Sequence, residues 1–156
     1  MVGYLLDTNH VSALGAGNAR IMQEINSLPP STLVRVCTIT LGEVEAGHQM
    51  TMTTNPQRRN EVIQVINARL LPLALPVSSS TRIYYAQIIS RLWHQHPPPN
   101  HRTKTEKHLV SLGIDINDVW IVAVAWEHGL TLLTTDGMDK IRAVVSETEV
   151  KFGSWL

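Results

Sequence analysis

The chain has 156 residues, of which 44% are hydrophobic and 17% are charged, and its formal net charge at neutral pH is zero. These values exclude a disordered chain and favour one globular domain over residues 1–156. The balanced charge excludes a global basic field, so any nucleic-acid site must be a local patch. The only cysteine, Cys37, excludes an internal disulfide and a multi-cysteine zinc site.

Short apolar runs rich in β-branched residues alternate with segments whose apolar residues recur at helical spacing. In the first half of the chain, the expected elements are a strand over 2–6, a helical region over 10–28 that breaks near Gly15 to Gly17, a strand over 33–39, helices over 40–50 and 56–71, and a strand over 73–77. In the second half, they are helices over 81–95, 105–112 and 118–128, a strand over 130–134, a helix over 138–144 and a strand over 149–152. This alternation predicts an α/β fold, a three-layer α/β/α sandwich with a mainly parallel central sheet.

The N-terminal residues do not form a basic region followed by a long apolar one, so no signal peptide is expected. No segment approaches the eighteen unbroken apolar residues that a membrane span requires. A single buried thiol fits a reducing compartment. We therefore expect a cytoplasmic protein without a membrane partner.

Four acidic residues lie where expected strands end or helices begin: Asp7, Glu43, Asp118 and Asp136. Ligands bind beyond the carboxyl ends of the strands in an open parallel sheet, so these carboxylates are expected to converge there. Carboxylate oxygens are the ligands that Mg²⁺ prefers, and Mn²⁺ accepts them too. Clustered carboxylates repel one another, and a divalent cation would offset that repulsion. We therefore expect a Mg²⁺ or Mn²⁺ site.

Each acid also has a purely structural interpretation. Asp7 is typical of a turn or a helix cap. Glu43 forms a possible capping box with Thr40, which would turn its carboxylate toward its own helix. Asp118 is a candidate N-cap of the apolar helix that follows it, and Asp136 a candidate turn residue. These alternatives stay open for each residue alone, and the joint placement of the four favours the metal site.

Two further acids flank this set. Asp115 precedes the helix that Asp118 is expected to open, so it is either a fifth member of the site or the cap of that helix. Asp139 is expected to support a short helix rather than to bind metal.

Four motifs together resemble the PIN domain family and, within it, the VapC-type ribonuclease toxins. The matching segments are 4–9, 39–44, 117–125 and 129–136, and the resemblance covers essentially the whole chain. It implies a Mg²⁺- or Mn²⁺-dependent endoribonuclease that acts on RNA. It also implies the toxin of a type II pair, neutralised by a small antitoxin protein, and a homodimer.

The resemblance assigns roles residue by residue. Asp7, Glu43 and Asp118 match the core metal-binding acids of the family, and Asp136 matches its fourth, more variable acid. The polar residues that orient the carboxylates or a bound water are matched by Thr8, Asn9 and Thr135. Two features depart from the family pattern: Trp120 is bulkier than the usual residue beside the third acid, and the segment 94–108 is longer than expected.

The segment 94–108 combines three prolines with four histidines and three basic residues. It is either a solvated loop or the positive surface that RNA requires beside an acidic pocket. In the second case the candidate RNA contacts are its histidines, His94, His96, His101 and His108, and its basic residues, Arg102, Lys104 and Lys107. An apolar stripe on the helix over 82–93 or on that over 118–126 is a candidate dimer or antitoxin surface.

Two other functions are weighed. One is a catalytically silent PIN-like module that binds RNA or protein and keeps its acids for structural reasons, which a metal titration would separate from a nuclease. The other is a haloacid-dehalogenase-like phosphatase, which also has an aspartate after its first strand. The sequence Asp7-Thr8-Asn9-His10-Val11 lacks the second aspartate and the threonine of that motif, which disfavours the phosphatase.

Overall fold

A computed structural model describes residues 3–50 and 55–156 of the chain. Its centre is a five-stranded sheet with the strand order β3-β2-β1-β4-β5, in which every neighbouring pair is parallel. The strands are β1 (Gly3–Leu6), β2 (Leu33–Cys37), β3 (Ala74–Leu75), β4 (Thr131–Leu133) and β5 (Phe152–Gly153). The sheet confirms the predicted α/β class and its parallel strands.

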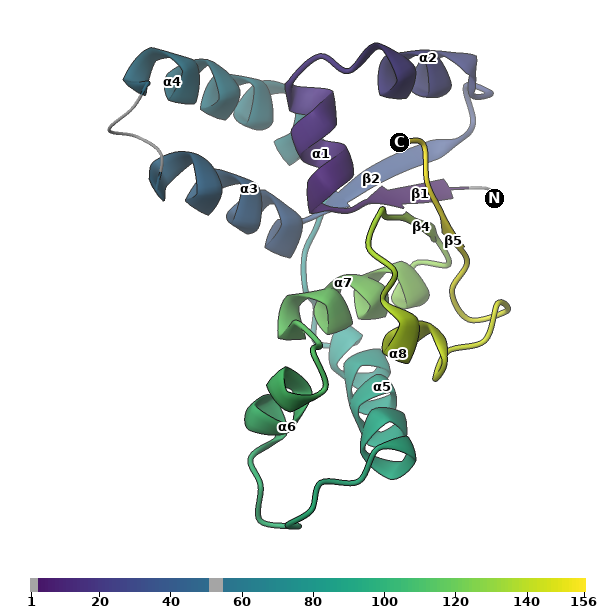
Figure 1. Cartoon of the computed structure of the whole chain (residues 1–156). Helices are drawn as coiled ribbons and strands as arrows, with labels where there is room; N and C mark the ends of the chain where they lie inside the picture. The colour runs from purple at the N-terminus through teal and green to yellow at the C-terminus, as the bar shows by residue number, and fades with distance from the viewer. Residues whose placement is uncertain (1–2, 51–54) are drawn as a thin grey trace.

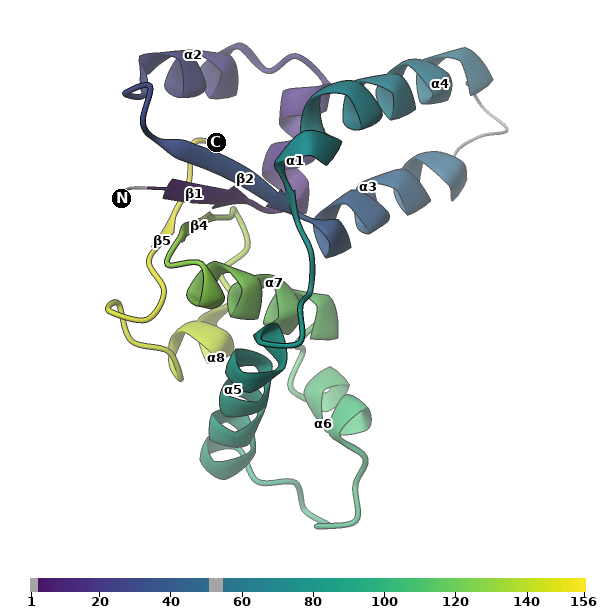
Figure 2. The same ribbon diagram turned by 180° about the vertical axis from the view of Figure 1, so that it is seen from behind.

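Helices cover both faces of the sheet, as the two opposite views in Figures 1 and 2 show. One layer contains α1 (Thr8–Gly15), α2 (Ala19–Ser27), α3 (Thr38–Met50) and α4 (Pro56–Val65), which continues through a π-helical turn (Ile66–Leu70) and a 3-10 turn (Leu71–Leu73). The other layer contains α5 (Thr81–Gln95), α6 (Thr105–Ser111), α7 (Ile116–Glu127) and α8 (Asp139–Arg142). The predicted three-layer α/β/α sandwich is therefore confirmed.

The two helical layers give two apolar cores, one on each face of the sheet. Successive strand residues point to opposite faces, so Leu5 packs with α5 and α7 whereas Leu6 packs with α1 and α3. Both leucines are fully buried. This is the reason why the strands appear as continuous apolar runs in the sequence.

Most element boundaries lie within a few residues of the prediction. The helical region over 10–28 breaks into α1 and α2 at Gly17, whose φ of +76° is left-handed. The strand predicted over 33–39 ends at Cys37, because Thr38 and Ile39 begin α3. The last strand is shorter than predicted and begins at Phe152.

In the part of the chain that the structure describes, no single helix is both long and apolar enough to cross a membrane. Among the described helices, only α6 and α7 taken together meet those requirements, and they are bent by 100° where they join.

Candidate functional site

The acidic residues meet at the carboxyl edge of the sheet, where the strand order reverses. From β1 the chain adds β2 and β3 on one side and then β4 and β5 on the other, so the crevice lies between the ends of β1 and β4. The backbone N–H of Asp7 donates to the carbonyl of Leu133 at 3.0 Å. This bond places Asp7 beside the loop that carries Thr134, Thr135 and Asp136.

Asp7 is buried, with 3% of its surface exposed, and is the N-cap of α1. Its Oδ1 accepts from the backbone N–H of His10 and contacts His10 Nδ1, both at 2.8 Å. Burial alone would raise the pKa of Asp7, but hydrogen bonds from His10 and Thr134 outweigh it and hold the pKa below the ordinary value. Asp7 is therefore an ionised carboxylate at neutral pH. The helix-cap interpretation is correct for this residue, and it leaves the proposed ligand role open.

Glu43 projects from α3 toward α1 and α7. The hydroxyl of Thr8 donates to its Oε2, and the side-chain amide of Asn117 donates to its Oε1 at 2.7 Å. The capping-box interpretation is wrong, because α3 begins at Thr38 and Thr40 lies inside the helix. The buried Oγ1 of Thr40 has no hydrogen-bond partner among the described residues.

Asp118 lies in the first turn of α7, but it is not the cap of that helix. The cap is Asp115, whose carboxylate accepts from the backbone N–H of Asn117 at 2.8 Å. The pKa of Asp118 is raised to about 7, first by burial and then by the negative charges of Asp115, Asp136, Glu43 and Asp7. The negative charges of all three other predicted acids therefore act on Asp118.

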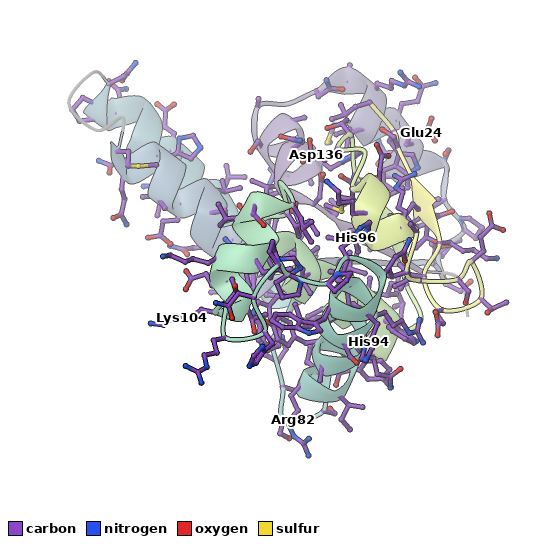
Figure 3. The ribbon with its side chains drawn as sticks, turned by 60° about the horizontal axis from the view of Figure 1, so that its bottom comes forward. Glu24, Arg82, His94, His96, Lys104 and Asp136 are labelled. Carbon is purple, nitrogen blue, oxygen red and sulfur yellow. The ribbon has the colours of Figure 1, made fainter. Side chains whose placement is uncertain are left out.

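Asp136 is exposed on the loop after β4, and Figure 3 shows it on that loop. Its Oδ2 lies 3.4 Å from the side-chain nitrogen of Asn9, which also donates to the hydroxyl of Thr135 at 2.8 Å. Its backbone N–H donates to the hydroxyl of Thr134 at 3.0 Å. The three residues that follow β1 therefore reach three parts of the site: Asp7 is itself an acid, Thr8 holds Glu43, and Asn9 holds the β4 loop.

The donor set contains only oxygen atoms, which suits a hard divalent cation such as Mg²⁺ or Mn²⁺. The concentration of negative charge around Asp118 fits a cation as well. In the present positions of the side chains in residues 3–50 and 55–156, no three acidic, histidine or cysteine residues form a metal-binding group. Asp7 and Glu43 instead accept hydrogen bonds from protein donors, which leave further lone pairs on their carboxylates for a cation.

The basic segment forms the connection between α5 and α6 (Figure 1). Arg102, Lys104 and Lys107 are exposed, and Figure 3 shows Lys104 at the edge of the molecule. His108 is different, because it is 4% exposed and its Nε2 donates to the carbonyl of His96. His108 therefore anchors α6 to the end of α5 and is not a surface contact.

Two other sequence features have clear structural roles. Trp120, which is bulky for its position, stacks on Tyr85 of α5 with ring centroids 3.8 Å apart. Of the two candidate partner helices, α7 has six buried residues and belongs to the core. The other helix, α5, exposes Ile83 to 46%.

Sequence reasoning missed three residues that hold the acids: His10, Asn117 and Thr134. His10 lies three positions after Asp7, which is the spacing of a helix cap and its contact, but its bond to the C-terminal segment has no local signal. Asn117 directly precedes Asp118 and acts on Glu43, which is 74 positions away in the chain. Such contacts follow only from the tertiary fold.

Comparison with known proteins agrees with this architecture. The PIN domain family matches residues 4–144. The fold is similar to a chain in the structure of VapBC2 from Rickettsia felis bound to a promoter DNA fragment, with 16% identity, a TM-score of 0.72 and coverage of 99% of this chain and 100% of the other. It is also similar to a chain of VapBC-1 from nontypeable Haemophilus influenzae, with 18% identity, a TM-score of 0.69 and coverage of 99% of this chain and 98% of the other. It is also similar to a chain of FitAcB from Neisseria gonorrhoeae (25%, 0.67, 97% of each chain). No curated protein matches. The family match extends over most of the length of this chain, so the chain belongs to the PIN domain family.

Proposed function

We propose that the protein is a Mg²⁺- or Mn²⁺-dependent endoribonuclease that hydrolyses RNA phosphodiester bonds. One observation carries the proposal: Asp7, Glu43 and Asp136 lie close enough to Asp118 to help raise its pKa to about 7. A fold has no structural need to collect four carboxylates at one crevice, because their repulsion lowers its stability. A divalent cation bound among them offsets that repulsion.

In this proposal Asp7, Glu43 and Asp118 hold the metal, and Asp136 completes the site directly or through water. The metal would lower the pKa of a bound water and stabilise the leaving oxygen of the phosphodiester. The protein orients its ligands through neighbouring polar groups. Thr8 and Asn117 each hold one oxygen of Glu43, and Asn9 holds the loop that carries Asp136.

We place the RNA contacts on Arg102, Lys104 and Lys107. An acidic crevice repels phosphate, so a ribonuclease needs positive charge nearby. All three residues are exposed, Arg102 and Lys104 before α6 and Lys107 within it, and α6 is followed by Asp115 and by the first turn of α7, which carries Asp118. The RNA backbone would lie across this segment and enter the crevice beside Asp118.

We further propose that the protein is the toxin of a type II toxin–antitoxin pair and forms a homodimer, with residues 1–156 acting as one nuclease unit. The support is the similarity of the fold to chains from VapBC complexes and from FitAcB. Co-expression with the product of an adjacent small gene tests the antitoxin, since a true partner co-purifies and suppresses cleavage. Light scattering of the purified chain measures its oligomeric state.

A catalytically silent RNA- or protein-binding module is the second candidate. It is favoured by the engagement of both oxygens of Glu43 by protein donors. It is also favoured by the lack of a ready three-residue metal group within the described residues. In such a module the acids would serve the fold alone.

Cleavage of a labelled tRNA pool separates the two candidates. The purified protein is assayed with Mg²⁺, with Mn²⁺ and with EDTA, beside Asp7→Asn and Asp118→Asn. Asp139→Asn is the matched control, because Asp139 is an exposed acid that is not among the charges acting on Asp118. A nuclease cleaves only with metal, loses cleavage in the first two variants and keeps it in the control. No metal-dependent cleavage by the folded protein would favour the silent module.

A further inference from the structure

His10 is a fully buried polar residue between the acidic site and the end of the chain. It lies in the first turn of α1, and its Nδ1 is 2.8 Å from Oδ1 of Asp7. Its other ring nitrogen, Nε2, is 3.1 Å from the backbone nitrogen of Trp155, which is 145 positions away in the sequence. The chemistry proposed above does not use His10.

The contact with Trp155 determines which ring nitrogen of His10 carries the proton. A backbone N–H donates and cannot accept, so Nε2 must be the acceptor and have no hydrogen. The neutral imidazole then carries its single proton on Nδ1, which donates to Asp7. The hydroxyl of Ser154 lies farther from Nε2, at 3.5 Å, and accommodates the same arrangement by donating.

The C-terminal segment is held firmly enough to set this arrangement. The side chain of Trp155 is 9% exposed and packs in the same core as Leu6 and Val11. Its ring lies 4.9 Å from that of Tyr4 in β1. Figure 1 shows the C-terminus on the same side of the sheet as α1, after β5 has paired at the sheet edge. The N–H group that meets His10 is therefore fixed by strand pairing and by apolar packing.

We propose that His10 is a positioning residue for Asp7 and that the backbone of Trp155 at the chain end sets its tautomer. The inference rests on the proposed function, since it matters chemically only if Asp7 binds metal. Partners that orient a ligating group typically contribute 10- to 100-fold to metal affinity. The last residues of the chain thus contribute to the metal site without touching the metal.

Two substitutions of His10 separate its two bonds. In His10→Asn the side-chain amide reaches about as far as Nδ1, so it retains a donor for Asp7 and loses the acceptor for Trp155. In His10→Gln the amide reaches about as far as Nε2, so it retains the acceptor and loses the donor. Each variant loses one buried hydrogen bond, so the two should lose a similar amount of folding stability. Thermal melting identifies any variant that is unfolded.

The readout is Mn²⁺ binding, measured by electron paramagnetic resonance without any RNA. We expect His10→Gln to weaken the site by about 10-fold or more, and His10→Asn to stay nearer to the wild-type affinity. An affinity of folded His10→Gln equal to that of the wild-type protein would overturn the positioning role. Asp7→Asn serves as the reference: if it leaves Mn²⁺ binding unchanged, the metal role of Asp7 in the proposed function fails, and the inference fails with it.

The tautomer is tested separately by the ¹⁵N chemical shifts of the His10 ring, with no metal present. The wild-type protein should show a protonated Nδ1 and an unprotonated Nε2. Trp155→Ala and Trp155→Pro both remove the indole, but only proline removes the backbone N–H. We expect the wild-type tautomer in Trp155→Ala and its loss in Trp155→Pro. A protonated Nε2 in the wild-type protein, or an unchanged tautomer in folded Trp155→Pro, would overturn the role of the chain end whatever the outcome of the metal titration.

Discussion

Asp118→Asn is expected to stabilise the metal-free protein at neutral pH while abolishing metal binding. The wild-type carboxyl is partly buried beside four other acids, and its pKa rises from 3.8 to about 7. The folded state therefore favours the neutral form of Asp118. Asparagine is neutral at every pH and nearly the same size, so it removes the repulsion and leaves the packing of α7 unchanged.

The sign follows from proton linkage. Below about pH 3 the carboxyl is protonated in both the folded and the unfolded chain, so its shifted pKa costs almost nothing. As the pH rises from about 4 to 7, the unfolded chain loses this proton while the folded chain retains it, and the stability of the wild-type protein falls. The loss is about 2 kcal/mol at pH 5 and about 4 kcal/mol at pH 8, as an upper bound, because solvent screens the partly exposed carboxyl and the site relaxes.

Thermal melting in EDTA at pH 5 and pH 8 measures the difference in stability between Asp118→Asn and the wild-type protein. For a chain of this size, 4 kcal/mol corresponds to a rise in melting temperature on the order of 10 °C. Asp118→Asn should therefore melt above the wild-type protein, and by a larger margin at pH 8. Asp139→Asn, an exposed acid in the first turn of α8, should show almost no margin at either pH.

The same thermal melts with Mn²⁺ in place of EDTA test whether Asp118 binds the cation. The cation should raise the free energy of unfolding of the wild-type protein at pH 8 by about 2.7 kcal/mol when its concentration is 100 times its dissociation constant, and its melting temperature should rise accordingly. Asp118→Asn should lose most of this gain. A margin for Asp118→Asn that is the same at both pH values, or a lower stability than the wild-type protein at pH 8, would refute the electrostatic reasoning.

Two further predictions use other parts of the chain. Thr40→Val should leave the free energy of unfolding unchanged or raise it by about 1 kcal/mol, because it removes a buried hydroxyl that has no hydrogen-bond partner among the described residues. Urea unfolding measures this, and a clear decrease in the free energy of unfolding would mean that the hydroxyl is hydrogen-bonded in solution. Neutralising Arg102, Lys104 and Lys107 together should weaken RNA binding. For single-stranded RNA, it should also reduce the slope of log affinity against log salt concentration by about 2. An unchanged slope would rule out these contacts.

The strands and their acids were predictable because local patterns determine them. The apolar run that forms β1 ends at Asp7, and the run that forms β4 ends shortly before Asp136. Both residues lie at the carboxyl edge because every strand is parallel, and the alternation of strands and helices had already predicted that. The order of the strands, and hence the position of the crevice between β1 and β4, was not predicted, because it depends on which side of β1 each later strand pairs.

The helix starts were less predictable, and this changed the interpretation of two acids. β-branched residues such as Thr38 and Ile39 favour strands, but here they begin α3, so Thr40 is too deep in the helix to cap it. Asp115 rather than Asp118 caps α7, because the helix begins two residues earlier than expected. In neither case does the acid cap its own helix: Glu43 is bound by Thr8 and Asn117, and Asp118 lies within reach of the charges of the other acids.

The strand order also has a consequence for the synthesis of the protein. β1 pairs with β2, about 30 residues later in the chain, and with β4, whose partner for Leu6 is Leu133. A chain emerging from the ribosome at roughly 5–20 residues per second can form the first pair long before the second. Asp7 and Glu43 therefore come together early, whereas Asp118 and Asp136 must wait for β4. We expect the four carboxylates to meet only after β4 and the loop that carries Asp136 have been made.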